Sequence, residues 1–500
     1  MGEDASTLQG RREITADAVV IGAGAGGAAC AYRLASRGLK VVVLEEGHRY
    51  TPRNFPASYG WALNHIYAEK GARHVEGEAL YPMPAGRGVG GSTLINSAIC
   101  FRAPDHVLER WVTELGLEGL SAEKMKPLYD FVSETIGVTE THPSLARLNN
   151  LAIKRGAERL GMEGAFIHRN APGCVGCGVC QLGCPSGGKG SVDRNFVPMA
   201  EELGAVFYAD CKVQEILLQK GRAAGIEATV HDSETGVQVG ALKVSSERVI
   251  LSAGTVGTVL LLLRQKLANA SGQVGKNLCI HPAVGTFGFG SEVIDGWDGV
   301  PQAYAVFLDR KEGILLQTYN ANPEIFFSTQ PWSGLDGMAK LRRLRNLAMC
   351  GGMASDHPGG TITLGRGGRA TVRYDLHDLD RKKLIRALRA ICSILFAAGA
   401  NEVFPGIGAG DVWVRDERAA HAILHDAVPE RDLPIYASHP MGTCRMGLDP
   451  RTSVAGPSGE THDVPGLYIA DASLMPSSLG VNPQLTVMSF GLLVGSAVRA

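Results

Sequence analysis

The sequence predicts an α/β fold in which a Rossmann-type nucleotide-binding domain is interleaved with an α+β domain that contains an antiparallel sheet. Residues 17–45 read as a strand, a glycine-rich turn, a helix and a second strand, which is the order and length of a βαβ unit. Strand-like runs then follow one another over 205–251 and 284–375. From residue 432 the chain returns to the glycine-rich, apolar composition of its first segment.

The composition is that of an ordinary globular protein, with 45% hydrophobic and 20% charged residues. Lys and Arg (49) nearly balance Asp and Glu (50), so neither nucleic acid nor an anionic membrane surface is an expected partner. The N-terminus lacks the basic start and apolar run of a secretory signal. The longest apolar stretch, "VILSAGTVGTVLLLL", is shorter than the roughly 18 residues of a membrane span. We therefore expect a cytoplasmic protein with no integral membrane segment and with unpaired cysteines.

The glycine-rich turn has the G-x-G-x-x-G pattern of a dinucleotide site, formed by Gly22, Gly24 and Gly27. The first glycine permits the tight turn, the second lets the backbone approach a pyrophosphate, and the third lets the helix pack closely. Glu45 ends the following strand, where a carboxylate accepts hydrogen bonds from an adenosine ribose. The pattern alone does not distinguish NAD from FAD.

The stretch "GRGVGGSTLINSAICFRAP", residues 86–104, bears on that choice. It resembles the first signature of the glucose–methanol–choline (GMC) oxidoreductases, which are FAD enzymes that oxidise alcohols. Similar likenesses appear in order in "RVILSAGTVGTVLLLL", "VGKNLCIHP", "SHPMGTCRMG" and "LYIADASLMPSSLGVNPQLTVMSFG". The first of these departs from the family at Val259, near which a proline is usual. The likeness extends from residue 17 to residue 495.

The resemblance implies which residues bind FAD. Ile95 stands where some members carry a histidine bonded to the flavin, so the FAD is expected to be non-covalent. Gly90, Gly91, Ser92 and Asn96 would lie against the pyrophosphate and isoalloxazine. Val213 would contact the adenine through its backbone, and Ala470 and Asp471 would bind the pyrophosphate and ribityl chain.

The resemblance also implies the catalytic pair, because His439 matches the catalytic histidine of the family and Asn482 matches its partner. An imidazole is suited to accept the hydroxyl proton at neutral pH as hydride leaves for flavin N5. An amide donor stabilises the developing alkoxide without competing for the proton. We expect His281, in "CIHP", to be structural, and Cys444 to be a buried small hydrophobic residue.

The segment "CVGCGVCQLGCPSGGKG" holds Cys174, Cys177, Cys180 and Cys184 in the spacing C-x2-C-x2-C-x3-C-P, which is that of bacterial ferredoxins. This spacing predicts an iron–sulfur cluster. Because there is one such run, the fourth ligand is either Cys184 or a distant thiol such as Cys211, and three ligands suit a 3Fe–4S cluster. Four thiolates also bind zinc, and metal-free thiols or a disulfide are further alternatives. Within the GMC family the insert resembles that of long-chain alcohol oxidases and their bacterial relatives.

Taken together, these observations predict an FAD-dependent enzyme that oxidises an apolar alcohol, long-chain or cyclic, to an aldehyde or ketone. An FAD-binding domain over 14–285 includes the Cys-rich insert 173–190, a substrate-binding domain covers 286–431, and 432–500 complete the FAD domain and carry the active site. Electrons pass to a protein or quinone through a cluster, or to O2 in an alcohol oxidase without one. A nicotinamide-dependent dehydrogenase is the alternative that explains the glycine turn and Glu45 but not the C-terminal block.

Overall fold

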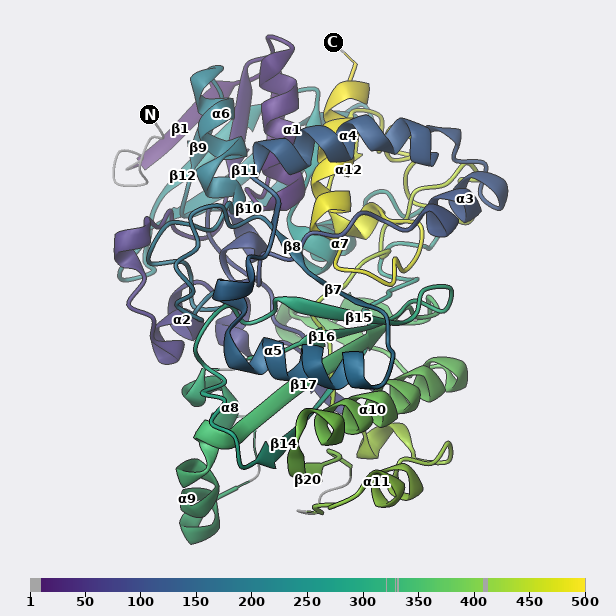
Figure 1. The fold of residues 1–500 in the computed structure, drawn as a ribbon. Coiled ribbons are helices and arrows are strands. Elements are labelled where there is room, and N and C mark those ends of the chain that lie inside the picture. The colour runs from purple at the N-terminus through teal and green to yellow at the C-terminus, as the bar shows by residue number, and fades with distance from the viewer. Residues whose placement is uncertain (1–9, 321, 329, 331, 408–411, 500) are drawn as a thin grey trace.

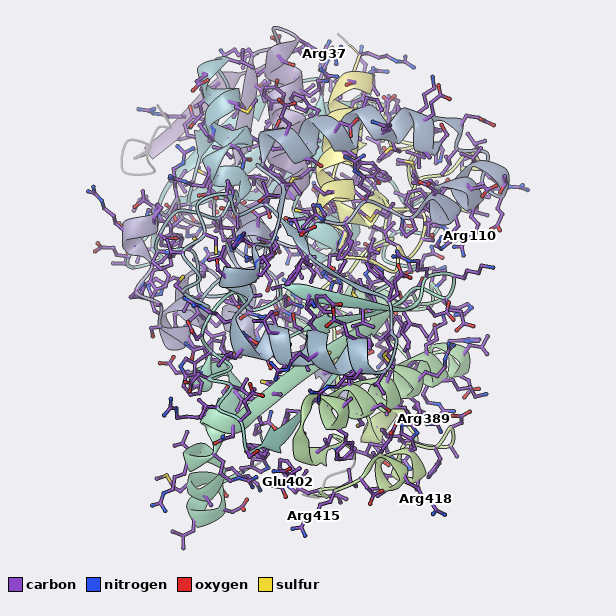
Figure 2. All side chains as sticks on the ribbon, in the orientation of Figure 1. Arg37, Arg110, Arg389, Glu402, Arg415 and Arg418 are labelled. Atoms are coloured by element: carbon purple, nitrogen blue, oxygen red, sulfur yellow. The ribbon has the colours of Figure 1, made fainter. Side chains whose placement is uncertain are left out.

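The computed structural model describes residues 10–320, 322–328, 330, 332–407 and 412–499. A parallel sheet and its helices form the upper part of the molecule in Figure 1, and an antiparallel sheet with long helices forms the lower part. Charged side chains such as Arg110 and Arg418 are exposed and lie at the periphery (Figure 2). The α/β prediction is confirmed, including the presence of antiparallel sheets.

The parallel sheet has the strand order β22-β13-β2-β3-β9, and it joins segments from both ends of the chain. Its strands are β2 (Ala18–Ile21), β3 (Val41–Leu44), β9 (Val206–Tyr208), β13 (Val249–Leu251) and β22 (Leu467–Ile469). Nearly every residue of these strands is buried. Runs of apolar residues without alternation form such strands because helices and loops cover both faces of a parallel sheet.

Helix α1 (Ala25–Ser36) packs against the C-terminal helix α12 (Gln484–Ala497). The approach is close because a Cβ at Gly491 would lie 2.3 Å from the carbonyl oxygen of Gly26. Arg37 also joins the ends of the two helices, because its Nη1 donates to the carbonyl oxygens of Gly495 and Val498 at 2.7 Å. The other helices of this part are α3 (Asp105–Thr113), α4 (Ala122–Thr135), α6 (Phe196–Glu202) and α7 (Gly254–Gln265).

A second sheet has the order β1-β12-β11-β10, with strands β1 (Gly10–Thr15), β10 (Cys211–Gln219), β11 (Arg222–His231) and β12 (Gln238–Ser245). Strands β10, β11 and β12 form an antiparallel meander within the strand-like runs of 205–251. The two flanking runs of that region, β9 and β13, instead join the parallel sheet. Local alternation identifies a strand but does not select its partner.

The large antiparallel sheet has the order β20-β14-β17-β16-β15-β7, and β21 pairs with β14. Its strands are β7 (Gly164–Phe166), β14 (Ala283–Gly290), β15 (Tyr304–Asp309), β16 (Ile314–Thr318), β17 (Leu347–Ala354), β20 (Ala400–Phe404) and β21 (Ile435–Tyr436). Helices α5 (Pro143–Arg159) and α10 (Asp378–Ala398) pack on it. Thus α5, β7 and β21 come from outside the segment 286–431 in which we expect the substrate domain.

The remaining elements are short. They are α2 (Tyr59–His65), α8 (Pro323–Ser328), α9 (Gly334–Arg342), α11 (Glu417–Ile423), β4 (His74–Glu76), β5 (Leu80–Pro82), β6 (Thr139–Glu140), β8 (His168–Arg169), β18 (Thr361–Leu364) and β19 (Ala370–Arg373). Among the residues that the structure describes, no helix combines the length and the apolar character needed to cross a membrane.

Candidate active site

The glycine turn between β2 and α1 has the backbone conformation that its sequence predicts. Gly22 has φ +101°, and a Cβ there would lie 2.3 Å from the carbonyl oxygen of Ser252. A Cβ at Gly27 would lie 2.0 Å from the carbonyl oxygen of Gly22. Gly24 is the N-cap of α1, so the positive end of that helix faces the turn and favours an anionic group.

A second glycine loop packs directly on the first. The backbone N–H of Gly90 donates to the carbonyl oxygen of Ala23 at 2.9 Å. A Cβ at Gly91 would lie 2.8 Å from the Cα of Gly24, and both Gly90 and Gly91 have positive φ. The two predicted cofactor-binding segments therefore form one glycine-rich cradle at the N-terminus of α1, which is the kind of site that accepts a pyrophosphate.

Glu45 lies under this cradle and accepts three backbone hydrogen bonds. The donors are the N–H groups of Ala23 (3.0 Å), Gly47 (2.9 Å) and Gly88 (3.1 Å). Burial raises the pKa of Glu45 to about 7, and these donors act in the opposite direction. The carboxylate thus joins both glycine loops to the end of β3. We expected Glu45 only to bind a ribose, so this structural role was not predicted.

The segment after β22 closes the cradle. A Cβ at Gly26 would lie 1.9 Å from the carbonyl oxygen of Ala470, so this segment packs on the start of α1. Both carboxylate oxygens of Asp471 are engaged, because they accept from Gly254 N–H (3.0 Å), Thr258 Oγ1 (2.6 Å) and the N–H and Oγ of Ser473 (2.9 and 2.6 Å). Burial raises the pKa of Asp471. Its side chain fixes the loop rather than facing a cofactor.

The other predicted cofactor residues lie on neighbouring segments. Ser92 Oγ accepts from Gly86 N–H at 3.0 Å, and Asn96 Nδ2 donates to Gln484 Oε1 at 2.9 Å. Ile95 is nearly buried and carries no nucleophilic atom. Val213 is a buried residue of β10, paired with Ala228 of β11.

The two predicted catalytic residues are neighbours. Asn482 Nδ2 and His439 Nε2 lie 3.3 Å apart. Gln317, on β16, donates from Nε2 to Asn482 Oδ1 at 2.6 Å and so orients the amide. The sequence analysis missed Gln317, because a glutamine within an apolar strand gives no sign of which distant residue it will contact.

His281 lies on the other side of His439. Their Nδ1 atoms are 3.3 Å apart, and the rings meet edge to face with centroids 5.3 Å apart. The N–H groups of Leu479 and Gly480 donate to His281 Nε2 at 3.0 and 2.9 Å. We expected His281 to hold a loop, and these two bonds do so, but the ring also contacts the predicted catalytic histidine.

Burial determines the charge of both imidazoles. It lowers the pKa of His439 to about 4. Burial, and secondarily the neighbouring His439, lowers the pKa of His281 well below its usual value. Both rings are therefore neutral at pH 7, and a neutral imidazole is the form that accepts a proton.

Asp356 holds the backbone segment that carries His281. Its carboxylate accepts from the N–H groups of Ile280 (2.8 Å) and His281 (3.2 Å), from Ser478 Oγ (2.7 Å) and from Tyr374 OH (2.9 Å). The segment around His281 needs such support because His281 itself has φ +48°, a backbone conformation that is costly for residues other than glycine.

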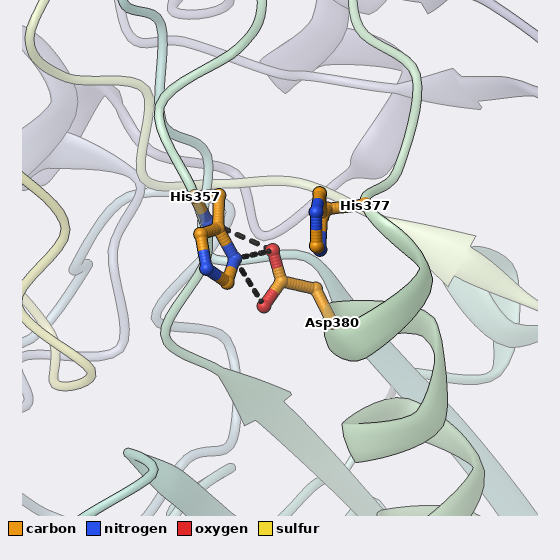
Figure 3. Close-up of side chains that lie close together, drawn as sticks. All are labelled: His357, His377 and Asp380. Carbon is orange, nitrogen blue, oxygen red and sulfur yellow. Dashed lines mark hydrogen bonds and ion pairs between the residues drawn. The ribbon is translucent and has the colours of Figure 1, made fainter.

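A cluster beside Asp356 anchors it to α10 (Figure 3). Donor atoms of His357, His377 and Asp380 lie within 4.8 Å of one another, which is close enough for one metal ion. They are already engaged, however. The buried Asp380 carboxylate accepts from Lys383 Nζ (2.9 Å), His357 N–H (2.8 Å) and His357 Nδ1 (2.9 Å), and His377 Nδ1 accepts from Leu379 N–H (3.3 Å). We assign this cluster to structural support.

The four cysteines of the ferredoxin-like run line one small cavity together with Arg169 and Lys189. All of the cysteines of the chain lie within the described residues and are free thiols. Cys184 lines the cavity with the other three cysteines of the run, whereas Cys211 does not. Gly176, Gly178 and Gly183 adopt positive φ between the cysteines, and this permits the loop to fold around the cavity.

The spacing of the sulfur atoms bears on which group fits. Among the described residues, no three of these cysteine sulfurs belong to a set of donor atoms within 4.8 Å of one another. A tetrahedral zinc ion with Zn–S bonds of about 2.3 Å needs its four sulfurs closer than that. An iron–sulfur cluster, in which each thiolate binds a different iron, holds its ligands farther apart. In this structure, therefore, the four sulfurs are not arranged as a tetrahedral zinc site.

A different cavity, of about 470 Å³, is lined by residues that include Arg222, Glu247 and Arg499. It lies at the amino-terminal ends of β13 and β22, whereas the glycine cradle lies at the carboxyl-terminal end of β2. Dinucleotides bind at the carboxyl ends of such strands, so this cavity is not a candidate for the cofactor.

Comparison with known proteins agrees with this arrangement. The N-terminal GMC oxidoreductase profile matches residues 16–283, and the C-terminal GMC oxidoreductase profile matches residues 353–491. An uncharacterized GMC-type oxidoreductase, Rv0492c of Mycobacterium tuberculosis, is 37% identical over 97% of this chain and 76% of its own length. The long-chain-alcohol oxidase FAO4A of Arabidopsis thaliana is 30% identical over 97% of this chain and 68% of its own.

Solved structures of low sequence identity share the fold. Pyridoxine 4-oxidase from Mesorbium loti superposes with a TM-score of 0.71 at 17% identity, over 96% of this chain and 98% of its own. A formate oxidase superposes with a TM-score of 0.71 at 14% identity, over 98% of both chains.

Proposed function

The chain belongs to the GMC oxidoreductase family, and we propose that it uses non-covalent FAD to oxidise the CH–OH group of an apolar alcohol to an aldehyde or ketone. The observation that carries the proposal is the contact of His439 with Asn482, together with the hydrogen bonds that join the His439 segment to the loop next to the glycine cradle. Thr255 Oγ1, at the start of α7, donates to the carbonyl oxygen of Pro440 at 2.6 Å. Gly442 N–H donates to the carbonyl oxygen of Ala472 at 3.1 Å, so the His439 segment is bonded to the loop that closes the cradle.

The residues at the cradle fit FAD. A Cβ at Gly22, Gly27 or Gly91 would lie within 2.8 Å of a neighbouring backbone atom, whereas one at Gly24 would have no such atom nearer than 3.8 Å, and the N-terminus of α1 faces this turn. We assign the pyrophosphate to Gly22, Gly24, Gly27, Gly90 and Gly91, the ribose to Glu45, the adenine to Val213, and the flavin and ribityl chain to Ser92, Asn96, Ala470 and Asp471. Since the carboxylate of Asp471 is engaged by protein donors, its backbone N–H is the group available to the cofactor. When bound, FAD supplies the hydride acceptor.

His439 takes the hydroxyl proton in this proposal, and Asn482 donates to the same oxygen. The buried, neutral imidazole meets the requirement for a base at neutral pH. Gln317 donates to the Oδ1 of Asn482. This bond directs the Nδ2 of Asn482 toward His439 and the reacting oxygen. Such a preorganised donor stabilises alkoxide character without reorganisation.

The base role also imposes a condition on His281. Because two backbone N–H groups donate to its Nε2, neutral His281 carries its hydrogen on Nδ1, directed at His439 Nδ1. His439 accepts a proton at Nε2 only when its own hydrogen is on Nδ1. We therefore propose that the two rings move apart when cofactor and alcohol bind, since two N–H groups do not face each other at 3.3 Å.

The apolar substrate is supported by the side chains that flank the catalytic residues. A hydrophobic cluster contains Leu315, two residues before Gln317, and Val481, next to Asn482. The other members are Ile99, Phe101, Ile167, Ala283, Ala305, Phe307, Met353 and Tyr436. Burial of an alkyl chain against such a surface contributes about 0.8 kcal/mol per methylene, which favours long-chain or cyclic alcohols.

The cysteine cavity suggests where the electrons go. We propose that Cys174, Cys177, Cys180 and Cys184 hold an iron–sulfur cluster, which when bound would carry single electrons to a protein or quinone. The alternative is an oxidase that uses O2, and the name of the Arabidopsis relative favours it. Iron and sulfide analysis of anaerobically purified protein, with peroxide measurement during aerobic turnover, separates the two.

The central experiment is anaerobic reduction of the FAD-loaded protein by a panel of alcohols, followed as loss of absorbance near 450 nm. We expect bleaching by apolar alcohols, and a rate lower by about 10²–10⁴ in His439→Ala, the usual contribution of a general base. The exposed His106→Ala is the matched control. Bleaching of His439→Ala at the wild-type rate would refute the assignment. Purified protein without a flavin spectrum would support the nicotinamide alternative instead.

A further inference from the structure

Two buried cations, Arg169 and Lys189, lie between the cysteine cavity and residues 94–97. Each side chain belongs to a residue that is 3% exposed. Both line the cavity that the four cysteines form. Neither has a role in the proposed proton and hydride transfer.

Lys189 connects the two sites through backbone oxygens. Its Nζ donates to the carbonyl oxygens of Leu94 (2.8 Å), Asn96 (3.1 Å) and Cys180 (2.9 Å). The ammonium thereby uses its three donors. Two of the acceptors belong to the segment predicted to lie against the flavin, and one belongs to the cysteine loop.

Arg169 makes a parallel connection. Its Nε donates to the carbonyl oxygen of Ser97 at 3.0 Å. On the other side of the guanidinium, Nη2 lies 3.3 Å from Cys180 Sγ and Nη1 lies 3.9 Å from Cys174 Sγ. The backbone N–H of Gly176 also donates to Cys174 Sγ at 3.4 Å.

The hydrogen-bond partners of these two cations are carbonyl oxygens and cysteine sulfurs, and none of them is a carboxylate. A buried charge without a counter-charge is costly. Lys189 interacts electrostatically with the carboxylate of Asp193, which can balance one of the two charges. The cavity that both cations border is lined by four cysteines, so an anionic group held by these cysteines would balance the other.

We propose that Arg169 and Lys189 are positioning residues that balance the charge of an iron–sulfur cluster on the four cysteines and hold it against residues 94–97. This rests on the cluster named in the proposed function. Net charge and hydrogen bonds to the sulfurs set the reduction potential of a cluster. Since reduction adds negative charge, each cation favours the reduced form, and its removal shifts the midpoint potential to more negative values.

The test compares Lys189→Met and Arg169→Met with the charge-preserving Lys189→Arg and Arg169→Lys, all purified without oxygen. Lys276→Met, at an exposed lysine, is the control. The readouts are iron and sulfide per chain, FAD per chain, and the cluster midpoint potential from a redox titration followed by electron paramagnetic resonance. Bleaching of the flavin by alcohol is measured separately.

The neutral variants are expected to keep FAD but either to lose iron or to keep it at a more negative midpoint potential. The charge-preserving variants are expected to lie closer to the wild type. Equal iron content and midpoint in the neutral variants and the control would overturn the inference, as would equal effects in the neutral and charge-preserving variants. A wild-type protein that takes up no iron during reconstitution with ferrous iron and sulfide would also overturn it. Alcohol oxidation would still stand in that case if the flavin is bleached.

Discussion

Replacement of Asn482 by Asp tests whether the His439 imidazole is the base, because it moves the pKa of His439 in a direction that the structure specifies. In the wild type, burial lowers this pKa to about 4. A base is active when unprotonated, so the rate is expected to fall as pH decreases through this value. At pH 5 a group of pKa 4 is ~90% neutral, whereas an ordinary histidine of pKa 6.5 is ~3% neutral. The two cases differ about 30-fold in active fraction at that pH.

A carboxylate at position 482 would lie near His439 Nε2, which is 3.3 Å from the present amide nitrogen. An opposite charge at this range favours the protonated imidazole and raises its pKa by about 1–3 units. The acid limb of kcat/KM should therefore move to roughly pH 5–7, and activity at pH 5 should fall about twofold to 100-fold below its plateau, depending on where in this range the pKa lies.

The assay is anaerobic flavin reduction between pH 4 and pH 8, with Asn482→Ala as the uncharged control. Both variants lose the donor to the alcohol oxygen, so the plateau decreases in each, and the comparison is of the position of the limb. We expect Asn482→Ala to keep the limb near the wild-type value. Coincident limbs in Asn482→Asp and Asn482→Ala would refute the reasoning, and so would a wild-type limb near pH 6.5.

Three further predictions follow from the same contacts. Gly22→Ala places a Cβ 2.3 Å from the Ser252 oxygen and should lose FAD. The control Gly38→Ala is also at positive φ but has no atom within 4 Å of the Cβ, so it should keep FAD and lose about 1 kcal/mol of folding stability. Equal FAD content in the two variants would contradict this. Because Ile95 carries no nucleophilic atom, acid precipitation should leave the flavin in the supernatant, and flavin in the pellet would show a covalent bond elsewhere. Asp356→Asn removes acceptor capacity from the four donors at that carboxylate and should lower both the melting temperature and the rate of flavin reduction. The loss of stability should be about 1–3 kcal/mol, with the exposed Asp105→Asn as the control.

The features that sequence alone predicted are those whose chemistry is local. The close packing at Gly27 depends on Gly22, which is only five positions away, and the positive φ of Gly22 is a property of its own backbone. The spacing of the four cysteines likewise brings them around one cavity. His439 and Asn482 are 43 residues apart, and they were predicted together because the family resemblance supplied both.

The features that sequence alone did not predict depend on contacts between distant segments. Gln317 reaches Asn482 across 165 positions, and Asp356 reaches the His281 N–H across 75. The expected ribose ligand Glu45 also joins the two glycine loops, because Ala23, Gly47 and Gly88 direct their N–H groups at one carboxylate. Periodicity and spacing in the sequence do not indicate that these residues will meet in space. Each of them is, by itself, an ordinary polar residue.

Residues 90–97 show why the two proposed redox sites are structurally dependent on each other. At one end of this segment, Gly90 and Gly91 pack on the glycine turn. At the other end, the carbonyl oxygens of Leu94, Asn96 and Ser97 accept from Lys189 and Arg169. Backbone oxygens make these contacts, so the side chains at positions 94 and 97 are not what the cations recognise. A change that displaces the cysteine loop is therefore expected to disturb the backbone contacts of residues 94–97, while Gly90 and Gly91 stay packed on the glycine turn.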